Sequence, residues 1–260
     1  MRKTCHVDPI SWEEPSRNKS IDVEQRVALE NAFHQSNLST YEKIQSFPNY
    51  LQTTYVRKFI SRYEIYAKIL EVHGSIVECG VLGGAGVFSW AHFSEIFEPY
   101  NHLRRIIGFD SFEGFPSISN IDNASTLKSV NLQTGGLKSE QHSHLEGLID
   151  IFDMNRPLQH ISKISLVKGD ASVTIPKFIE DNPEIVCALL WLDFDLYEGT
   201  RVALKHFLPR MPKGSLIAFD ELNHPLWPGE TVALFEEVGI RNLRIKRLPF
   251  GSTVSYAVLE

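Results

Sequence analysis

The stretch at positions 76–86 reads IVECGVLGGAG. Its first residues are mostly apolar and suit a buried strand, and a glycine turn then leads into a helical pattern from about Gly84. Glycine serves where the backbone turns tightly or approaches another group closely. Leu82 stands where a dinucleotide-binding turn needs its second glycine, and the Lys and Ser/Thr of a phosphate-binding P-loop are missing. The stretch therefore predicts a strand–turn–helix unit that binds something other than a pyrophosphate.

Strand-like and helix-like runs alternate after this unit. Further strands are expected at 105–109, 164–167, 185–192 and 215–219, and helices at 84–97, 172–181, 198–208 and 229–238. This alternation predicts a parallel, doubly wound α/β sheet. Two β-rich runs, 241–248 and 253–258, follow with too short a connection for a parallel crossover, so they should form an antiparallel pair. An open parallel sheet that ends in a hairpin is typical of class I methyltransferases.

Two units are expected along the chain. Residues 1–74 should form a loose arm, up to about residue 20, and helices at 23–33 and 50–72 that cover the sheet or a partner subunit. We therefore expect a homodimer or a higher homo-oligomer. Residues 75–260 should form the catalytic domain. The insertion at 117–162 is polar at first and then helical, and we expect it to act as a lid above the strand ends.

Composition narrows the class of protein. The 260 residues, 43% of them hydrophobic, suit one large α/β domain, and the formal charge of -6 argues against a nucleic-acid binder. Cys5, Cys79 and Cys187 are widely spaced and are expected to be reduced thiols, the last two buried. No apolar run approaches the roughly 20 residues of a membrane span. We therefore expect a cytoplasmic protein with a small-molecule ligand and no membrane contact.

Acidic residues end two of the apolar runs. Asp193 and Asp195 end one, and Asp220 and Glu221 follow the other. A buried carboxylate without a counter-charge is costly, and Arg201 is the first basic residue after Asp195, so a bound cation is the expected compensation. All-oxygen ligation without a His or Cys cluster favours Mg²⁺, with Mn²⁺ as a substitute.

The glycine turn and the next two strand ends offer a place for a cofactor. Glu78, Gly80 and Gly84 resemble the E-x-G-x-x-x-G turn of S-adenosylmethionine-dependent methyltransferases, in which the methionine part lies against the glycines and the acid faces its charged end. Asp110 ends the next strand, where an acid can accept hydrogen bonds from both ribose hydroxyls, and Asp170 ends the third strand near an expected adenine amine. The structural alternatives are tight strand-to-helix packing for the glycines and a turn or helix cap for Asp110.

Three longer motifs resemble the macrocin O-methyltransferase family, metal-dependent enzymes that methylate sugar hydroxyls on antibiotics and nucleotide-linked deoxysugars. They are VECGV at 77–81, DSFEGFP at 110–116 and LDFDLYEGT at 192–200, within a resemblance that covers about residues 75–238. The resemblance implies a Rossmann-like, mostly parallel seven-stranded class I methyltransferase fold with helices on both faces. It also implies S-adenosylmethionine and Mg²⁺ as cofactors and a small sugar or glycoside as substrate.

The same resemblance assigns roles to residues. It implies Asp195 as the general base and Asp193, Asp220 and Glu221 as metal ligands. The family usually has two aspartates at the last two positions, so Glu221, one methylene longer, departs from its pattern. The implied cofactor-binding residues are Glu78, Gly80, Val81, Gly84, Asp110, Ser111, Gly169, Asp170 and Asp193.

Two other functions stay open at this point. A catechol or phenol O-methyltransferase uses a similar metal site but needs a flat apolar slot, which Trp227 and the lid could form. A non-catalytic cofactor-binding protein on the same fold is the second alternative, for which Glu221 is the hint. Metal-dependent turnover of a substrate panel separates the three.

Overall fold

The computed structural model describes residues 20–124, 129–249 and 253–260. Cys5 and most of the predicted loose arm lie outside these ranges. Within them the strands form one sheet in the order β3-β2-β1-β4-β5-β7-β6. Strands β1 to β5 are parallel, whereas β7 runs antiparallel to both β5 and β6. The predicted parallel sheet with a C-terminal antiparallel pair is therefore confirmed. The strands are β1 (Ser75–Cys79), β2 (Ile106–Asp110), β3 (Ile164–Lys168), β4 (Cys187–Leu192), β5 (Leu216–Phe219), β6 (Lys246–Arg247) and β7 (Ser255–Val258).

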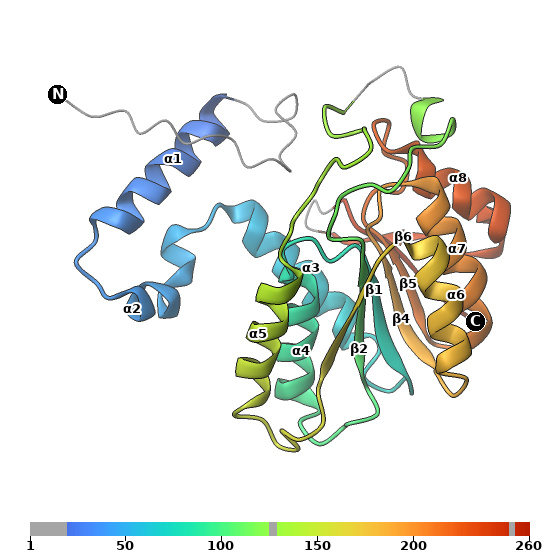
Figure 1. The fold of residues 1–260 in the computed structure, drawn as a ribbon, viewed down its shortest axis with the longest axis horizontal. Coiled ribbons are helices and arrows are strands. Elements are labelled where there is room, and N and C mark those ends of the chain that lie inside the picture. Colours follow the sequence, from blue (N-terminus) through green and yellow to red (C-terminus); the bar gives the residue numbers. More distant parts are fainter. Residues whose placement is uncertain (1–19, 125–128, 250–252) are drawn as a thin grey trace.

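Helices cover both faces of the sheet (Figure 1). Alternate strand residues point to opposite sides, so Ile76 packs with the helices of one face and Val77 with those of the other. The first face carries α3 (Thr53–Ala67), α4 (Ala85–Phe97) and α5 (His142–Asp153), and the second carries α6 (Ala171–Asp181), α7 (Tyr197–Phe207) and α8 (Pro228–Glu237). Cys79 and Cys187 are buried free thiols in the second layer, as predicted.

The helices before α3 are α1 (Ser20–Gln35), α2 (Thr40–Gln45) and η1 (Phe47–Tyr50), and α1 and α2 lie to one side of the sheet in Figure 1. Helix α3 then connects these N-terminal helices to the core. Aromatic residues on one side of α3 differ in exposure: Tyr66 is fully buried, whereas Phe59 and Tyr63 are 41% and 40% exposed. The exposed half stays a candidate contact for the predicted homodimer.

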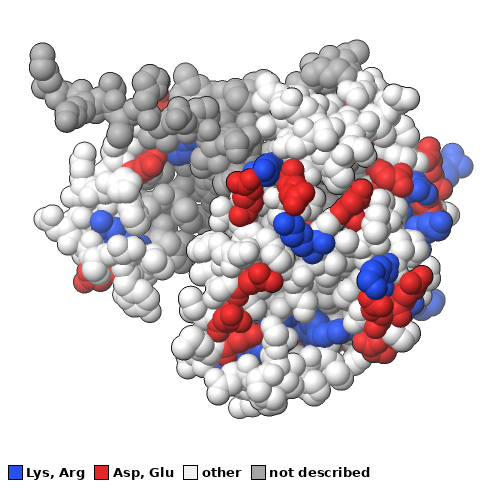
Figure 2. Space-filling model, in the orientation of Figure 1, with Lys and Arg blue, Asp and Glu red and all other residues white. Residues whose placement is uncertain are grey.

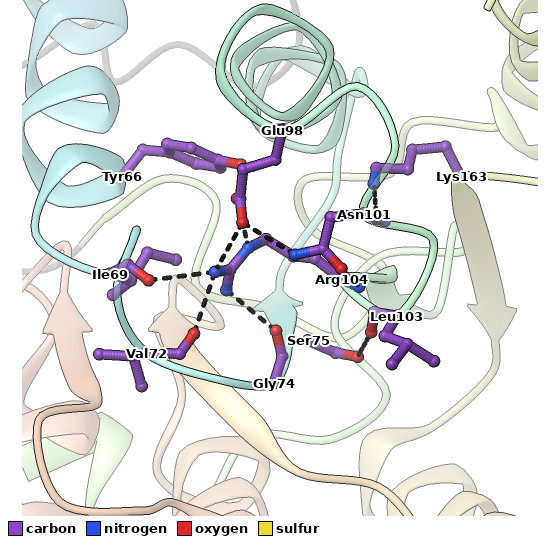
Figure 3. Close-up of polar contacts among 10 residues, drawn as sticks. All are labelled: Tyr66, Ile69, Val72, Gly74, Ser75, Glu98, Asn101, Leu103, Arg104 and Lys163. Carbon is purple, nitrogen blue, oxygen red and sulfur yellow. Dashed lines mark hydrogen bonds and ion pairs between the residues drawn. The ribbon is translucent and has the colours of Figure 1, made fainter. Parts of the chain in front are cut away.

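A buried arginine fastens the edge of the sheet where β1 and β2 begin (Figure 3). Arg104 donates hydrogen bonds to the carboxylate of Glu98, with its Nε 2.6 Å from Oε2, and to the main-chain carbonyls of Ile69, Val72 and Gly74. Five donors in a fixed fork let one guanidinium serve several acceptors. The network ties the end of α3 to the loop between α4 and β2, at the edge of the sheet where the parallel strands start.

The predicted insertion at 117–162 divides into two parts. Its helix, α5, packs into the core through Leu145 and Ile149 and contributes nothing to the lining of the main pocket. The part before it forms a small apolar cluster with the loops after β4 and β5. That cluster comprises Phe115, Leu196, Leu226 and Trp227, with Ile118, Leu132 and Leu137 packed against it.

The surface seen in Figure 2 mixes the two signs of charge. Lys and Arg lie among Asp and Glu over the described part of this face, without a continuous basic patch. None of the helices in the described ranges is both long and apolar enough to cross a membrane.

Candidate active site

A pocket lies at the carboxyl ends of β1 to β4, where the strand order reverses between β1 and β4. In open α/β sheets this crevice is the usual place for a ligand. Seven of the predicted site residues line it, and four of them are aspartates at or just after the ends of β2, β3 and β4. They are Gly80, Asp110, Ser111, Gly169, Asp170, Asp193 and Asp195.

Main chain forms the floor of the pocket between β1 and β4. Gly80 has φ +95°, and a Cβ added there would lie 2.0 Å from the carbonyl oxygen of Asp193. The amide of Asp193 donates to the Cys79 carbonyl at 2.8 Å, which holds the two strand ends together. Position 80 therefore requires glycine for both its φ and its space.

Asp110 ties the end of β2 to the glycine turn. Its Oδ2 accepts from the amides of Val81 and Leu82, both at 2.8 Å, and its Oδ1 accepts from the amide of Phe112 at 2.6 Å. A carboxylate has about four acceptor positions, so roughly one remains for a ligand. Asp110 therefore does cap the turn, which was the structural alternative for this residue. A ribose with two hydroxyls would need a second acceptor beside Asp110.

Three predicted cofactor residues lie behind the pocket wall. Glu78 is 1% exposed and accepts a hydrogen bond from Nε1 of Trp90 at 2.6 Å. Burial raises the pKa of Glu78 to about 7, although Arg62 and the Trp90 hydrogen bond oppose the rise. Val81 is buried, and the cap residue Gly84 faces Leu145 of α5, whose Cδ2 would lie 2.5 Å from an added Cβ. None of the three lines the pocket, and their positions suit support of the glycine turn.

The third strand end presents a capped helix to the pocket. Oδ1 of Asp170 accepts from the amide of Ser172 at 2.8 Å and caps α6. Gly169 has φ +136°, and its amide donates to the Asp110 carbonyl at 2.9 Å. Asp170 thus has a local structural role as well as a place in the pocket lining.

The acids after β4 and β5 gather at the same edge. Asp220 is 5% exposed, and its amide donates to the Leu192 carbonyl at 3.0 Å. Asp193 borders the pocket, yet burial of its carboxyl raises its pKa well above the usual range, and the charges of Asp220 and Asp195 raise it further. The two strand ends therefore bring Asp193, Asp195 and Asp220 within electrostatic reach of one another.

Counter-charge for these acids comes in part from α3, which is distant in the sequence, whereas the sequence near the acids offers few bases, as noted above. Nζ of Lys58 lies 4.0 Å from Oδ2 of Asp220. Arg62, one turn further along α3, is 9% exposed, lies over the ring of Trp191 and lowers the pKa of both Glu78 and Asp193. Sequence distance hid both bases, because the packing of α3 against the sheet decides where they lie.

The acids are of the chemical type that binds a divalent cation, but their side chains are not arranged as a metal site in this structure. Carboxylates of Asp193, Asp220 and Glu221 make an all-oxygen set of the kind that Mg²⁺ prefers. In the described part of the chain, however, no three side chains of His, Cys, Asp and Glu converge to form a ready metal site. Oε2 of Glu221 lies 3.5 Å from Nδ1 of His224.

A further acid escaped the sequence analysis. Glu230, in the first turn of α8, is fully buried, and its Oε1 accepts from the amide of Glu221 at 3.1 Å. Burial and the charges of Asp220 and Glu221 raise its pKa well above the usual range. Glu230 therefore fixes the main chain of the turn that carries Glu221, and the sequence around it gave no sign of this.

Four turns that border the site hold a non-glycine residue with positive φ. These residues follow β1, β2, β4 and β5, and they are Leu82, Phe112, Asp195 and Asn223, with φ from 49° to 64°. Such conformations carry strain and are concentrated at functional sites. The predicted base, Asp195, is one of them, and α7 starts just after it with Leu196, not Asp195, as its N-cap.

The strand order and the position of the pocket define a class I methyltransferase. Residues 63–236 match the model of the macrocin-O-methyltransferase (TylF) family, and the chain belongs to that family. It is accordingly an O-methyltransferase, with S-adenosylmethionine as methyl donor. No curated protein matches the chain.

Solved structures agree with the family. A calicheamicin methyltransferase, CalS11, superposes with a TM-score of 0.88 at 31% identity, over 93% of each chain. The apo structure of CalS11, described as a TDP-rhamnose 3'-O-methyltransferase, gives a TM-score of 0.80 at 30% identity over 93% of this chain and 95% of that one. The O-methyltransferase NovP shares the fold, with a TM-score of 0.60 at 17% identity over 78% and 80%.

Proposed function

We propose that the chain transfers the methyl group of S-adenosylmethionine to a sugar hydroxyl, with Mg²⁺ and with Asp195 as general base. The observation that carries the proposal is that Asp193 and Asp195 line the pocket while Asp220, on the next strand end, is near enough for its charge to raise the pKa of Asp193. The described sugar substrate of CalS11, with which this chain shares 30% identity, supports a sugar as acceptor.

The charge of the pocket supports the cofactor. S-adenosylmethionine is a cation at neutral pH, because its sulfonium adds to a zwitterionic amino acid. Among the described residues that line the pocket are several carboxylates and no Lys or Arg, and opposite charges attract more strongly near a protein interior than in bulk water. The acids are Asp110, Asp122, Asp170, Asp193, Asp195 and Glu198. A diphosphate on the acceptor would therefore have to lie outside this pocket.

The chemistry needs more than one aspartate. A sugar hydroxyl is a very weak acid, comparable to water, whereas an ordinary Asp has a pKa of about 3.9, so an aspartate alone is far too weak a base to remove the proton. Mg²⁺ held by Asp193 and Asp220, with Glu221 as a third ligand, would acidify a bound hydroxyl. S-adenosylmethionine would supply the methyl group, with the C–S electron pair left on sulfur as the O–C bond formed, and Asp195 would take the proton of the hydroxyl.

The aromatic-substrate alternative loses its structural argument. Trp227 is 4% exposed and packs against Phe115, with ring centroids 5.8 Å apart. It lies in the apolar cluster beside the pocket and does not line it. No flat apolar slot therefore follows from Trp227.

The test is detection of a methylated product by mass spectrometry, with methyl-deuterated S-adenosylmethionine. Nucleotide sugars, glycosides and catechols would be offered as acceptors, each with Mg²⁺ and with EDTA. We expect methylation of a sugar hydroxyl that EDTA abolishes. Methylation of catechols alone would refute the sugar proposal, and full activity in EDTA would refute the metal.

A further inference from the structure

One buried carboxylate joins the segment 115–124 to the helix that follows Asp195. Asp122 is 2% exposed and lines the pocket. Its Oδ2 accepts from the amide of Ser119 at 3.0 Å and from the Ser119 hydroxyl at 2.6 Å. Its Oδ1 accepts from the amide of Tyr197, the first residue of α7, at 2.8 Å. The two oxygens thus hold two distant parts of the chain.

Helix α7 depends on this contact for its start. The first amides of a helix have no partner within the helix, and its N-cap residue, Leu196, offers no side-chain acceptor. Asp122 supplies an acceptor, and its negative charge suits the positive end of the helix dipole. Tyr197 follows the strained Asp195 by two residues, so a fixed Tyr197 amide also limits where the carboxylate of Asp195 can point.

The junction is built for close approach. A Cβ at Gly229 of α8 would lie 2.3 Å from Oδ1 of Asp122 and 2.3 Å from the Tyr197 nitrogen. Beside it, Phe115 packs in one apolar cluster with Leu196. The segment 115–124 therefore rests on the residues after β4 at both a polar and an apolar contact.

We propose that Asp122 is a positioning residue for the transfer reaction: it couples the segment 115–124, which borders the bound ligand, to the turn that carries Asp195. This inference rests on the proposed role of Asp195 as base. A ligand that fills the pocket touches the segment around Ser119 and Asp122 and so restricts its motion. The hydrogen bond from the Tyr197 amide to Asp122 then restricts the motion of the turn as well. Asp122 itself touches no reacting atom.

The test compares Asp122→Ala with Asp122→Asn. The amide oxygen of Asn can still accept from Tyr197, whereas Ala cannot. Since small misplacements of reacting groups cost up to about 100-fold in rate, we expect Asp122→Ala to lower kcat about 10- to 100-fold. The kcat of Asp122→Asn should be about threefold or more above that of Asp122→Ala. S-adenosylhomocysteine lacks the sulfonium charge that the pocket acids would attract, so its affinity, measured by calorimetry, should change by less than about threefold if the effect of Asp122 falls on orientation and not on binding.

Two further variants bracket the result. Asn120→Ala, at an exposed residue of the same segment, should leave kcat within about twofold, since surface changes are usually mild. Gly229→Ala forces a methyl into the junction and should lower kcat as Asp122→Ala does. If Asp122→Ala keeps wild-type kcat, or loses activity only through weaker cofactor binding, the proposal is overturned.

Hydrogen exchange separates this inference from the proposed function. With S-adenosylhomocysteine bound, the amides of residues 195–198 should exchange more slowly in the wild type, and Asp122→Ala should remove most of that protection. Equal protection in both proteins overturns the coupling, whatever the substrate proves to be. Failure of every sugar acceptor, with this difference still present, would instead refute the proposed function.

Discussion

The amine of Lys58 lies 4.0 Å from Oδ2 of Asp220, so a helix near the start of the chain meets the strand end that carries the acids. The charge of Asp220 raises the pKa of Lys58, and Asp193 and Glu221 add to the rise. Lys58 thus remains protonated at neutral pH beside two of the proposed metal ligands. An ammonium and a metal ion at one carboxylate repel each other, so we expect competition between them.

Removal of the Lys58 charge should tighten binding of Mg²⁺. Two unit charges 4 Å apart interact by about 1 kcal/mol in a water-like medium, which corresponds to roughly fivefold in affinity. Isothermal titration of Lys58→Gln with MgCl₂ measures the change. Lys177→Gln, at an exposed lysine paired with Asp181, is the matched control and should bind as the wild type does. Weaker binding by Lys58→Gln would show that Lys58 supports the metal site.

Replacement of Asp195 by Asn should remove the proton acceptor and leave the pocket intact. General-base catalysis contributes about 10²- to 10⁴-fold, so kcat should fall by that order. Calorimetric affinities for S-adenosylhomocysteine and Mg²⁺ should stay near the wild-type values. A mutant with normal kcat would contradict the base assignment, and one that loses cofactor affinity would place Asp195 in binding.

Glu78 should make the protein less stable as the pH rises. Its pKa is about 7 when folded, against 4.5 as its ordinary value, so the folded state holds the proton more tightly. Stability from this group is full below pH 4.5 and is lost as the pH rises towards 7. Glu78→Gln, which keeps an acceptor for Trp90, should gain on the order of 2 kcal/mol over the wild type between pH 5 and pH 8. Urea unfolding at both pH values decides this, and parallel curves would refute it.

Two adjacent arginines should differ sharply in their effect on stability. Arg104 is 2% exposed in its network, whereas Arg105 pairs with the exposed Glu184 at 3.1 Å. Loss of one partner from a buried ion pair costs about 3–5 kcal/mol, and an exposed pair contributes about 0–1 kcal/mol. Arg104→Met should therefore lower the free energy of unfolding by several kcal/mol, and Arg105→Met by little. Equal losses would mean that the carbonyl contacts of Arg104 contribute nothing.

Much of the sheet was predictable, because a parallel sheet covered on both faces needs long apolar runs separated by helices. The last strands were less so. The run 241–248 has a strand-like composition, yet its first residues belong to a 3₁₀ turn (Ile240–Asn242), and only Lys246 and Arg247 form β6. Local propensity could not show how few residues pair with β7.

The strand-end acids were predictable because each follows directly after an apolar strand. Lys58, Arg62, Asp122 and Glu230 were not, since each is an ordinary charged residue in a helix or polar segment until tertiary packing brings it to the site. The sequence held a weak indication for two of them, because Lys58 and Arg62 are spaced i, i+4 and so lie on the same side of α3. Glu78 shows the converse, because its motif suggests a ligand contact and its side chain lies in the core.

The contact between Gly80 and the Asp193 carbonyl also bears on how acceptor preference could change in such an enzyme. That part of the pocket is main chain against main chain, so substitutions there cannot reshape it without separating β1 from β4. Pro116 and Ser117 line the same pocket and carry no such restriction, unlike Phe115, Ser119 and Asp122, whose contacts hold their segment to the residues after β4. Libraries aimed at new acceptors should therefore randomise positions 116 and 117 and leave the strand ends as they are.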